Sequence, residues 1–217
     1  MEPVTLTTGR LLLRTVAPFD APALYDACQD PGIQRWTQVP SPYLPEHAES
    51  FAAHQVPDGW RDDTAYNFGA FLRTDSPDGT PARDDDSAHA REGAAGAPHP
   101  REGALVGMIG VIRRLQRTGE IGFWVAPQHR GRGYVTEGAL AVTRWAFTGA
   151  GIDRMEWRAE VGNAPSRTAA LKIGFTLEGT LRSGLSNKGV RRDCWIGSLL
   201  PHELGLDGTE PYLPTPA

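Results

Sequence analysis

The sequence is poor in cysteine and has no long apolar run. Its 217 residues include only Cys28 and Cys194, and their spacing is typical of neither a metal site nor a disulfide framework. We expect both to be small core residues in a reducing compartment. No stretch approaches 18 uninterrupted apolar residues, and no basic region followed by an apolar run opens the chain. These absences predict a cytoplasmic protein without a signal peptide or a membrane span.

The chain also lacks an excess of positive charge. Lys and Arg number 22 against 26 Asp and Glu, a net charge of −4. Residues 75–103 contain three Arg and seven acidic residues, 3 − 7 = −4, so the rest of the chain is balanced. This distribution excludes a basic nucleic-acid-binding protein and a generally acidic, solvating chain. The hydrophobic content of 40% is sufficient for a core.

Residues 75–103 contain no Val, Ile, Leu, Met, Phe, Trp, Tyr or Cys. Because such a segment buries no large apolar side chain, nothing offsets the entropy lost on ordering it. We expect a disordered insert that is passive in function. Residues 66–73 and 104–115 on its two sides both have the pattern of strands, so the insert would connect an elongated hairpin.

The remaining pattern predicts an α/β fold with a mixed, mostly antiparallel sheet flanked by helices. We expect a single domain over residues 1–217, with a tail at 205–217. Apolar periodicity and breakers predict strands at 11–16, 66–73, 104–112, 120–125, 154–160, 175–181 and 192–200. They predict helices from Asp20 to about residue 28, and at 45–55, 135–149 and 165–172. Strands and helices that alternate in the second half favour a layered α/β architecture.

One strand-to-helix turn has the strongest chemical signal. Between the strand at 120–125 and the helix at 135–149, two glycines lie one residue apart in Gln128-His129-Arg130-Gly131-Arg132-Gly133. Glycines let the backbone turn tightly and present several N–H groups in one direction, and the following helix adds its positive dipole end. Residues 113–132 also contain five arginines against one acid. The turn suits a pyrophosphate, although a lone pair of glycines is more often an ordinary turn.

Two other phosphate motifs do not match this turn. A P-loop requires Lys and Ser or Thr after its last glycine, where this chain has Tyr134 and Val135. A dinucleotide-binding fingerprint requires a third small residue at the position of Thr136, near the start of a βαβ unit. Several strands and helices already precede the turn.

Four motifs together resemble the Gcn5-related N-acetyltransferase (GNAT) superfamily. The turn, as Gln128-x-x-Gly131-x-Gly133, is similar to its acetyl-CoA loop. The run from Asn163 through Ser166 and Arg167 to Gly174-Phe175 resembles its Asn…Gly-Phe helix, in the form found in the branch that acetylates ribosomal-protein N-termini (RimJ and RimL type). The opening Thr8-x-Arg10-Leu-x-Leu-Arg14 and the ending Arg192-Asp193…Ser198-Leu-Leu200 are similar to that branch as well. The resemblance covers nearly the whole chain outside 75–103.

The resemblance implies acetyl-CoA as a cosubstrate and a set of residues that bind it. Backbone amides of the turn would bind the pyrophosphate, and an exposed strand edge would pair with the pantetheine. Asn163 would hydrogen-bond the pantetheine arm. The full expected set is Phe123, Trp124, Val125, Gln128, His129, Arg130, Gly131, Arg132, Gly133, Tyr134, Asn163, Ser166 and Arg167.

Acetyl transfer to an amine requires a base and an acid. Glu120 is the best placed base, directly or through water, although a strand-end carboxylate paired with an arginine is an equal alternative. The superfamily's frequent acid, a Tyr four residues before Gly-Phe, is replaced here by Ala170, and Ser166 is the substitute that the branch offers. An ordinary helix-start Ser bonded to backbone is the alternative. A carboxylate that some branch members carry falls on Leu185 here, which weakens the case for a ribosomal acceptor.

The sequence indicates less about the residues that would bind the amine acceptor. Trp36, Tyr43 and Trp60 lie in the N-terminal segment that lines the acceptor groove in the family, although such aromatics are more often core residues. The acceptor would be a small-molecule amine or a peptide N-terminus, without a membrane or nucleic-acid partner. The six histidines show no paired spacing, so no metal is expected, and an exposed C-terminal strand would suit a homodimer. The alternative function is a catalytically silent acyl-CoA-binding module.

Overall fold

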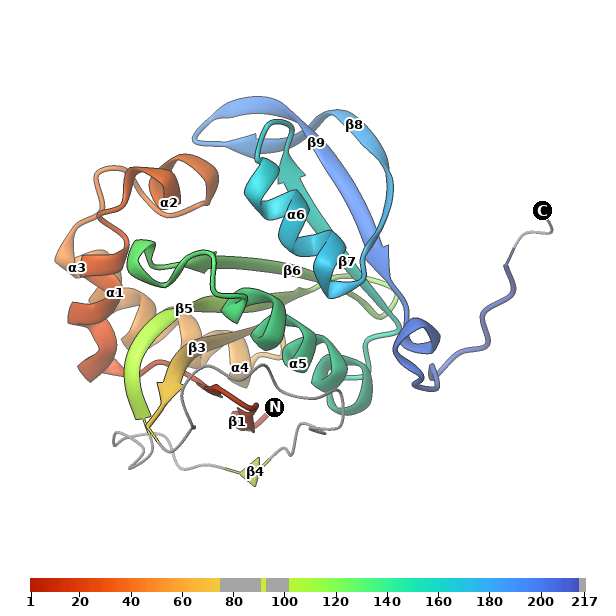
Figure 1. Cartoon of the computed structure of the whole chain (residues 1–217), viewed down its shortest axis with the longest axis horizontal. Helices are drawn as coiled ribbons and strands as arrows, with labels where there is room; N and C mark the ends of the chain where they lie inside the picture. The colour runs from red at the N-terminus through yellow and green to blue at the C-terminus, as the bar shows by residue number, and fades with distance from the viewer. Residues whose placement is uncertain (75–90, 93–101, 215–217) are drawn as a thin grey trace.

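A nine-stranded sheet forms the centre of the computed structural model, which describes residues 1–74, 91–92 and 102–214 (Figure 1). The strand order is β4-β1-β2-β3-β5-β6-β7-β9-β8. All neighbouring strands are antiparallel except β6 and β7, which are parallel. The strands are β1 (Val4–Thr7), β2 (Leu11–Arg14), β3 (Ala65–Arg73), β4 (Arg91–Glu92), β5 (Glu102–Arg113), β6 (Thr118–Val125), β7 (Arg154–Glu160), β8 (Thr176–Asn187) and β9 (Val190–Leu199).

Helices lie on both sides of this sheet, as the sequence predicts for an α/β layer fold. The α-helices are α1 (Ala21–Ala27), α2 (Pro31–Trp36), α3 (Pro45–Ser50), α4 (Val56–Arg61), α5 (Tyr134–Gly149) and α6 (Ala164–Ile173). A π-helical turn, η2 (Phe51–Gln55), joins α3 to α4, and three short 3₁₀ turns are η1 (Pro18–Asp20), η3 (Pro127–His129) and η4 (Pro201–Leu204). Figure 1 shows α5 and α6 together in front of the sheet. No helix of the described ranges has the length and apolar character needed to cross a membrane.

The parallel pair β6–β7 separates partway along its length. Its ladder runs from Thr118 opposite Arg154 to Ile121 opposite Trp157 and ends there within the described residues. Beyond that rung, β6 continues paired only with β5, and β7 continues paired only with β9. Residues 122–125 and 158–160 therefore face an opening between the two strands, where backbone groups lack a neighbouring strand.

The core lies between the sheet and α5. A methyl group built on Gly138 of α5 would lie within 3.4 Å of Ile109, Leu11 and Leu13, so the helix packs closely on the strands there. At the other end of α5, Trp145 packs its ring against Trp60, Tyr66 and Phe68 at centroid separations of 5.2–5.4 Å. Such edge-on and tilted aromatic contacts add to the area that these rings bury. This packing fixes the start of α5 relative to β5 and β6.

Most predicted elements are present, and the following ones differ. The strand β1 and the helix α2 have no counterpart in the prediction, the predicted helix at 45–55 extends through α4, and β8 extends to Asn187. The predicted insert at 75–103 lies mostly outside the described residues. The short parts of it that are described, Arg91–Glu92 paired with β1 and residues 102–103 at the start of β5, belong to the sheet. β3 and β5 pair as the predicted hairpin.

Both cysteines are buried and free, as predicted. Burial raises the pKa of the Cys28 thiol to about 12, so this group stays protonated near neutral pH. The C-terminal tail continues past η4 without a helix or strand through residue 214, and Thr209 donates its backbone N–H to Asp153 at 2.7 Å.

Candidate active site

The glycine turn after β6 is open to solvent. Gly131 and Gly133 have φ angles of 76° and 78°, the left-handed region that a side chain disfavours. A Cβ built on Gly131 would meet no atom within 4 Å of the described structure. Gly133 is the N-cap of α5, and the first N–H groups of a helix have no partner inside it. The turn therefore offers backbone donors, a positive helix end and free space at one place.

The two arginines of the turn are used differently. Arg130 donates to both carboxylate oxygens of Asp30 and to the Val125 carbonyl, the shortest of these contacts being 2.5 Å. The Arg130 guanidinium also lowers the pKa of Asp30 below its usual range. Since its guanidinium is held by the start of α2, Arg130 acts as a link between the turn and α2. Arg132 remains exposed at the turn.

Arg10 also belongs to this turn, although it was not among the predicted site residues. Its guanidinium donates to Glu137 of α5 at 2.7 Å and to the Arg132 carbonyl at 3.0 Å, and it stands 4.7 Å from the Tyr134 ring centre. The Thr8 hydroxyl donates to the same carboxylate at 2.6 Å. The Thr8-x-Arg10 motif in the sequence was the available signal. It holds the N-terminus against the first turn of α5.

His129 lies in the same turn and is half-buried, with its ring 6.2 Å from that of Tyr134. Burial, and then the nearby charge of Arg132, lower the pKa of His129. Both effects favour the neutral imidazole. A neutral ring leaves the positive charge of the turn to Arg132 and to the backbone.

The opening between β6 and β7 starts next to this turn. Phe123, Trp124 and Val125 lie on its β6 side, beyond the end of the ladder with β7, and their side chains are half-buried. Asn163 caps α6 across the opening by accepting a hydrogen bond from the Ser166 N–H at 3.3 Å. This cap uses the amide oxygen and leaves the Asn163 NH₂ group for another partner. Arg167 is exposed, with its guanidinium 5.3 Å from the Trp195 ring centre.

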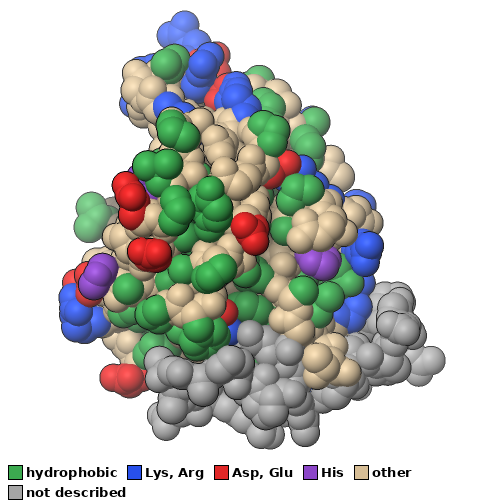
Figure 2. All heavy atoms as spheres, turned by 90° about the vertical axis from the view of Figure 1, so that its left-hand side faces the viewer, with side chains coloured by type: hydrophobic (Ala, Val, Ile, Leu, Met, Phe, Trp, Pro, Cys, Tyr) green, Lys and Arg blue, Asp and Glu red, His purple; other side chains and the backbone are tan. Residues whose placement is uncertain are grey.

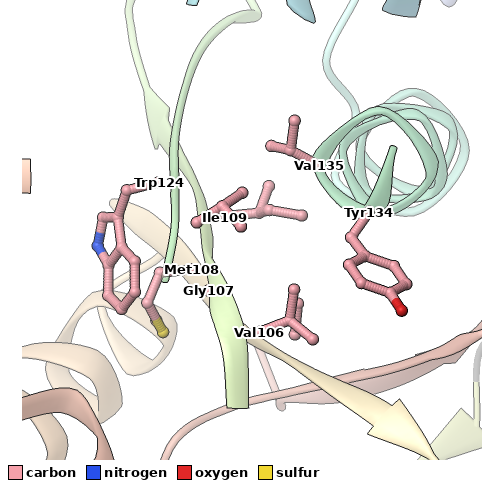
Figure 3. A pocket seen from close by; sticks show the side chains of 9 residues that line it. Val106, Gly107, Met108, Ile109, Trp124, Tyr134 and Val135 are labelled. Carbon is pink, nitrogen blue, oxygen red and sulfur yellow. The ribbon is translucent and has the colours of Figure 1, made fainter. Parts of the chain in front are cut away.

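Beside the start of α5 lies a small hollow lined by apolar side chains (Figure 3). β5 contributes Val106, Gly107, Met108 and Ile109, while Trp124 and Val125 come from β6, Tyr134 and Val135 from α5, and Ala70 from β3. In Figure 3, Trp124 lies on one side of the β5 ribbon, and Tyr134 lies on the other side. No ionisable carboxylate or imidazole lines this hollow, so it supplies packing rather than acid–base chemistry.

Ser166 is bonded to β7. Its hydroxyl oxygen accepts a hydrogen bond from the indole N–H of Trp157 at 3.0 Å. Trp157 is the last β7 residue in the ladder with β6, so this contact places Ser166 where the opening begins. The alternative for Ser166, a hydrogen bond from its hydroxyl to the backbone, has no counterpart among the described residues.

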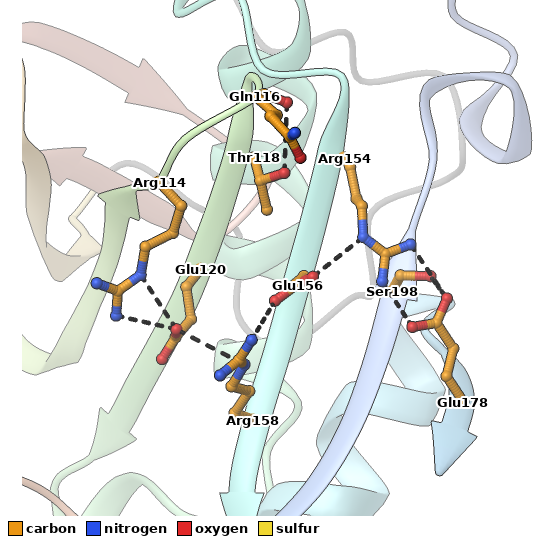
Figure 4. A network of polar contacts seen from close by, with 9 residues as sticks. All are labelled: Arg114, Gln116, Thr118, Glu120, Arg154, Glu156, Arg158, Glu178 and Ser198. Carbon is orange, nitrogen blue, oxygen red and sulfur yellow. Dashed lines mark hydrogen bonds and ion pairs between the residues drawn. The ribbon is translucent and has the colours of Figure 1, made fainter. Parts of the chain in front are cut away.

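Glu120 lies on the other face of the sheet from Ile121, since side chains alternate along a strand. Figure 4 shows it in a network of acids and arginines that spans β6, β7 and β8. Its carboxylate accepts a hydrogen bond from Arg114 at 3.0 Å and lies 3.9 Å from the Arg158 guanidinium. Glu120 therefore has arginine partners, as expected for the alternative role of a paired strand-end carboxylate. Its side chain is 23% exposed and still contacts solvent.

Two of the three predicted acceptor residues are core residues. Trp60 is 1% exposed within the aromatic cluster of Trp145, and Tyr43 is 6% exposed and stacked against Tyr25. A side chain enclosed by the core cannot contact an acceptor, so these two predictions are corrected. Trp36 is half-buried, and a Cβ on Gly162 in the turn between β7 and α6 would lie 3.8 Å from it. Of the three, Trp36 is the one that is not enclosed by the core, and it lies beside the turn that follows β7.

α2, which carries Trp36, is tied to the C-terminal half of the sheet. Arg35 forms two hydrogen bonds with Glu160 at the end of β7, at 2.6 and 2.9 Å. Its carbonyl accepts a hydrogen bond from Asn187 at the end of β8, at 3.1 Å. The described residues contain no group of three His, Cys, Asp or Glu side chains that could hold a metal ion.

The sequence of this chain is similar to a known protein family and to two named relatives. Residues 10–176 match the family model described as acetyltransferase (GNAT) domain. The chain is 36% identical over 104 residues to YdaF of Bacillus subtilis (strain 168), named as a candidate ribosomal N-acetyltransferase, with 47% of this chain and 57% of that protein aligned. It is 32% identical over 84 residues to the ribosomal-protein-serine acetyltransferase of Escherichia coli (strain K12), with 38% and 47% aligned. The aligned part thus spans about half the length of these relatives.

Solved structures share the fold over almost the full chain. A candidate ribosomal-protein-serine acetyltransferase from Vibrio cholerae superposes with a TM-score of 0.70 at 22% identity, covering 91% of this chain and 97% of that one. RimL, a ribosomal L7/L12 alpha-N-protein acetyltransferase in complex with coenzyme A, gives a TM-score of 0.68 at 18% identity, covering 92% and 98%. At these identities the similarity establishes the fold.

Proposed function

The chain belongs to the GNAT acetyltransferase domain family, and on that premise we propose that it transfers the acetyl group of acetyl-CoA directly to a primary amine. The observation that carries this proposal is the opening between β6 and β7 beside the glycine turn. One end of it supplies donors for a pyrophosphate, and its walls are strand edges without a neighbouring strand, which an extended chain can pair with. Acetyl-CoA has both parts, a polyanionic head and a linear arm with amide groups.

The glycine turn supports this placement of the pyrophosphate head group of acetyl-CoA. Backbone N–H groups near a helix N-terminus bind phosphates well because they point outward and carry the positive end of the helix dipole. The exposed Arg132 adds charge at the turn. The pantetheine arm would then follow Phe123, Trp124 and Val125 as an added strand, a use of free edge groups that needs no specific side chain. The NH₂ group of Asn163 would donate to the same arm.

The proposed base and the proposed acid belong to different faces of the sheet. Glu120 would accept a proton from the attacking amine, directly or through one water, and return it to solvent. As the C–S bond breaks, Ser166 would donate its hydroxyl proton to the departing thiolate and regain a proton from water. The amine loses one proton and CoA gains one, so the reaction balances as amine plus acetyl-CoA to amide plus CoA. The backbone of the opening would hydrogen-bond the carbonyl oxygen as negative charge develops on it.

The acceptor we propose is a peptide N-terminus or a small primary amine. The relatives named as ribosomal-protein acetyltransferases favour the first class. Figure 2 shows Lys and Arg side chains gathered at the top of the face that carries α1–α3, and the β8–β9 hairpin there exposes Arg182, Lys188, Arg191 and Arg192. Positive charge beside the opening attracts acceptors that carry negative groups near the amine. The alternative function is a binding module that retains the acyl-CoA site without turnover, because Ala170 replaces the Tyr of many superfamily members.

A screen of N-terminal peptides and small primary amines for release of the CoA thiol tests this proposal. We expect acetyl-CoA to raise the melting temperature, since a ligand that binds only the folded state stabilises it, and at least one amine to release CoA. Stabilisation without thiol release for any amine would favour the silent module. No stabilisation at saturating acetyl-CoA would contradict both functions.

A further inference from the structure

Trp157 makes the one polar side-chain contact of Ser166 in the described structure. The indole Nε1–H donates to the Ser166 Oγ at 3.0 Å, and Trp157 is 2% exposed. In the sheet, the backbone of Trp157 lies between Ile121 of β6 and Gly197 of β9. The indole N–H of this buried side chain is therefore a fixed donor, whereas the hydroxyl of Ser166 can rotate.

This contact excludes one direction for the hydroxyl proton of Ser166. An indole N–H donates and never accepts, so the Ser166 proton cannot be directed back at Trp157. Within residues 1–74, 91–92 and 102–214, no group accepts a hydrogen bond from this hydroxyl. The oxygen is held from one side, and its proton is available to a group in the opening, which begins at the Trp157 rung.

We propose that Trp157 is a positioning residue that fixes the Ser166 oxygen and directs its proton at the thioester sulfur. This inference rests on the proposed acetyl transfer. When the C–S bond breaks and the thiolate forms, a hydroxyl that already accepts a hydrogen bond is a stronger donor, because hydrogen bonds in a chain polarise one another. The proton goes from Ser166 to sulfur, and water returns one to Ser166. Trp157 keeps its own proton throughout.

The competing explanation is that Trp157 only fills the core. A phenylalanine would fill most of the same space, but it has no N–H, so Trp157→Phe separates the two roles. If the N–H positions Ser166, we expect kcat to fall about tenfold while KM for acetyl-CoA stays within about twofold, because one hydrogen bond to the acid is lost while the cofactor site is intact. Trp145→Phe is the matched control, since Trp145 is equally enclosed, at 5% exposure, and has no contact with Ser166.

A double-mutant cycle with Ser166→Ala identifies the path of the effect. Once the hydroxyl is absent, Trp157→Phe should cause no further loss of kcat, because Trp157 acts through Ser166. Losses that multiply in the double variant, or a kcat for Trp157→Phe equal to that of wild type, would overturn the proposal. A wild-type chain that releases no CoA with any amine would instead contradict the proposed function.

A readout independent of activity tests the contact itself. In ¹⁵N–¹H spectra of the full chain, Ser166→Ala should shift the Trp157 indole N–H resonance and speed its hydrogen exchange, while the Trp145 resonance stays unchanged. An unchanged Trp157 resonance would overturn the proposal even if the chain proves to be an active acetyltransferase.

Discussion

At the scale of single residues, Glu120 has a close counterpart in Glu156. The two are partners in the β6–β7 ladder, so their side chains lie on the same face of the sheet. Both lie near Arg158, at 3.9 Å for Glu120 and 3.0 Å for Glu156. They differ in their further partners, because Glu156 also pairs with Arg154, whereas Glu120 pairs with Arg114. Glu156 therefore controls for the loss of an ion pair on this face.

We expect Glu120→Gln to lower kcat by about 10²-fold, the usual contribution of a general base. Its pH–rate profile should also lose the limb that reports a base, since the amide cannot accept the proton. Glu156→Gln should retain nearly wild-type turnover. Steady-state kinetics across pH on both variants make the comparison. Equal losses in the two variants would mean that the ion-pair network, and not a base, accounts for the effect.

The sequence indicated which residues to consider at this scale, but it could not show their partners. Both alternatives for Glu120 were visible, and its pairing with arginines is now a fact of the structure. The contact of Ser166 with Trp157 joins α6 to β7 and has no local pattern that would reveal it. Trp60 illustrates the limit on the acceptor side, because the ring that buries it, Trp145, is 85 residues away along the chain.

At the scale of elements, the turn between β6 and α5 was the most predictable part of the molecule. The glycine spacing indicated a tight turn, and Gly131 and Gly133 both have left-handed backbone there. The helix that follows begins at Tyr134, one residue from its predicted start. Local sequence determines such a turn, because the constraint lies in the backbone of the residues themselves.

Gly131→Trp should abolish the rise in melting temperature caused by CoA. A side chain there would occupy the space expected for the pyrophosphate, and no neighbouring atom now fills it. Gly189→Trp is the control, since Gly189 in the β8–β9 turn has a φ of 77° and equally open surroundings, so the backbone strain is matched. We expect Gly189→Trp to retain the stabilisation by CoA in thermal unfolding. Stabilisation of the Gly131 variant by CoA would show that the pyrophosphate binds elsewhere.

The helix α2 shows why other elements escaped prediction. Asp30-Pro31-Gly32 has the composition of a helix stop, and α1 does end before it. The same residues also start a helix, because Asp30 accepts a hydrogen bond from the Ile33 N–H at 2.8 Å and Pro31 occupies the first position. The guanidinium of Arg130, 100 residues away along the chain, donates a hydrogen bond to the carboxylate of Asp30. No local sequence pattern reveals this contact. β1 was missed because four residues carry too little periodicity.

Asp20 occupies the N-cap position of α1, but its side chain makes no capping hydrogen bond and is used elsewhere. It is 6% exposed, and it accepts two hydrogen bonds from Arg14, at 2.8 and 2.9 Å, and one from the Ala17 N–H. Asp20→Ala would leave the buried guanidinium without this carboxylate, which costs about 3–5 kcal/mol of unfolding free energy. Asp58→Ala, at an exposed pair with Arg61, should cost at most about 0.5 kcal/mol. Urea unfolding measures both, and similar small losses would contradict this role for Asp20.

At the scale of the whole molecule, the N-terminal helices are joined to the C-terminal sheet across the opening. Arg35 of α2 and Glu160 of β7 form the principal link, and Arg192 of β9 lies 3.7 Å from the same carboxylate. Arg35 lowers the pKa of Glu160, in first place through its hydrogen bonds. The link brings Trp36 beside the turn between β7 and α6. The position of α2 therefore depends on contacts between distant parts of the chain, in which this ion pair is joined by the hydrogen bond from Asn187 to the Arg35 carbonyl.

This link makes stability depend on pH in the acid range. Because the folded-state pKa of Glu160 is lowered, its contribution is fully present above the unfolded pKa of about 4.3 and is lost as pH falls through the folded value. The difference in unfolding free energy between wild type and Glu160→Gln should be constant near neutral pH and shrink below about pH 4. Glu49→Gln, at an exposed site on α3, should show little difference at either pH. A Glu160 difference that persists unchanged in acid would contradict this coupling.

The central claim is that an acetyl group leaves CoA and becomes attached to an amine at the opening between β6 and β7. The most direct measurement is incubation of the full chain with isotopically labelled acetyl-CoA and the best acceptor from the amine screen, followed by mass spectrometry of the acceptor. The account predicts labelled acetyl on the acceptor's amine with wild type and with Gly189→Trp, and none with Gly131→Trp. Labelled product formed equally well by the Gly131 variant, or no labelled product from wild type that binds acetyl-CoA, would contradict it.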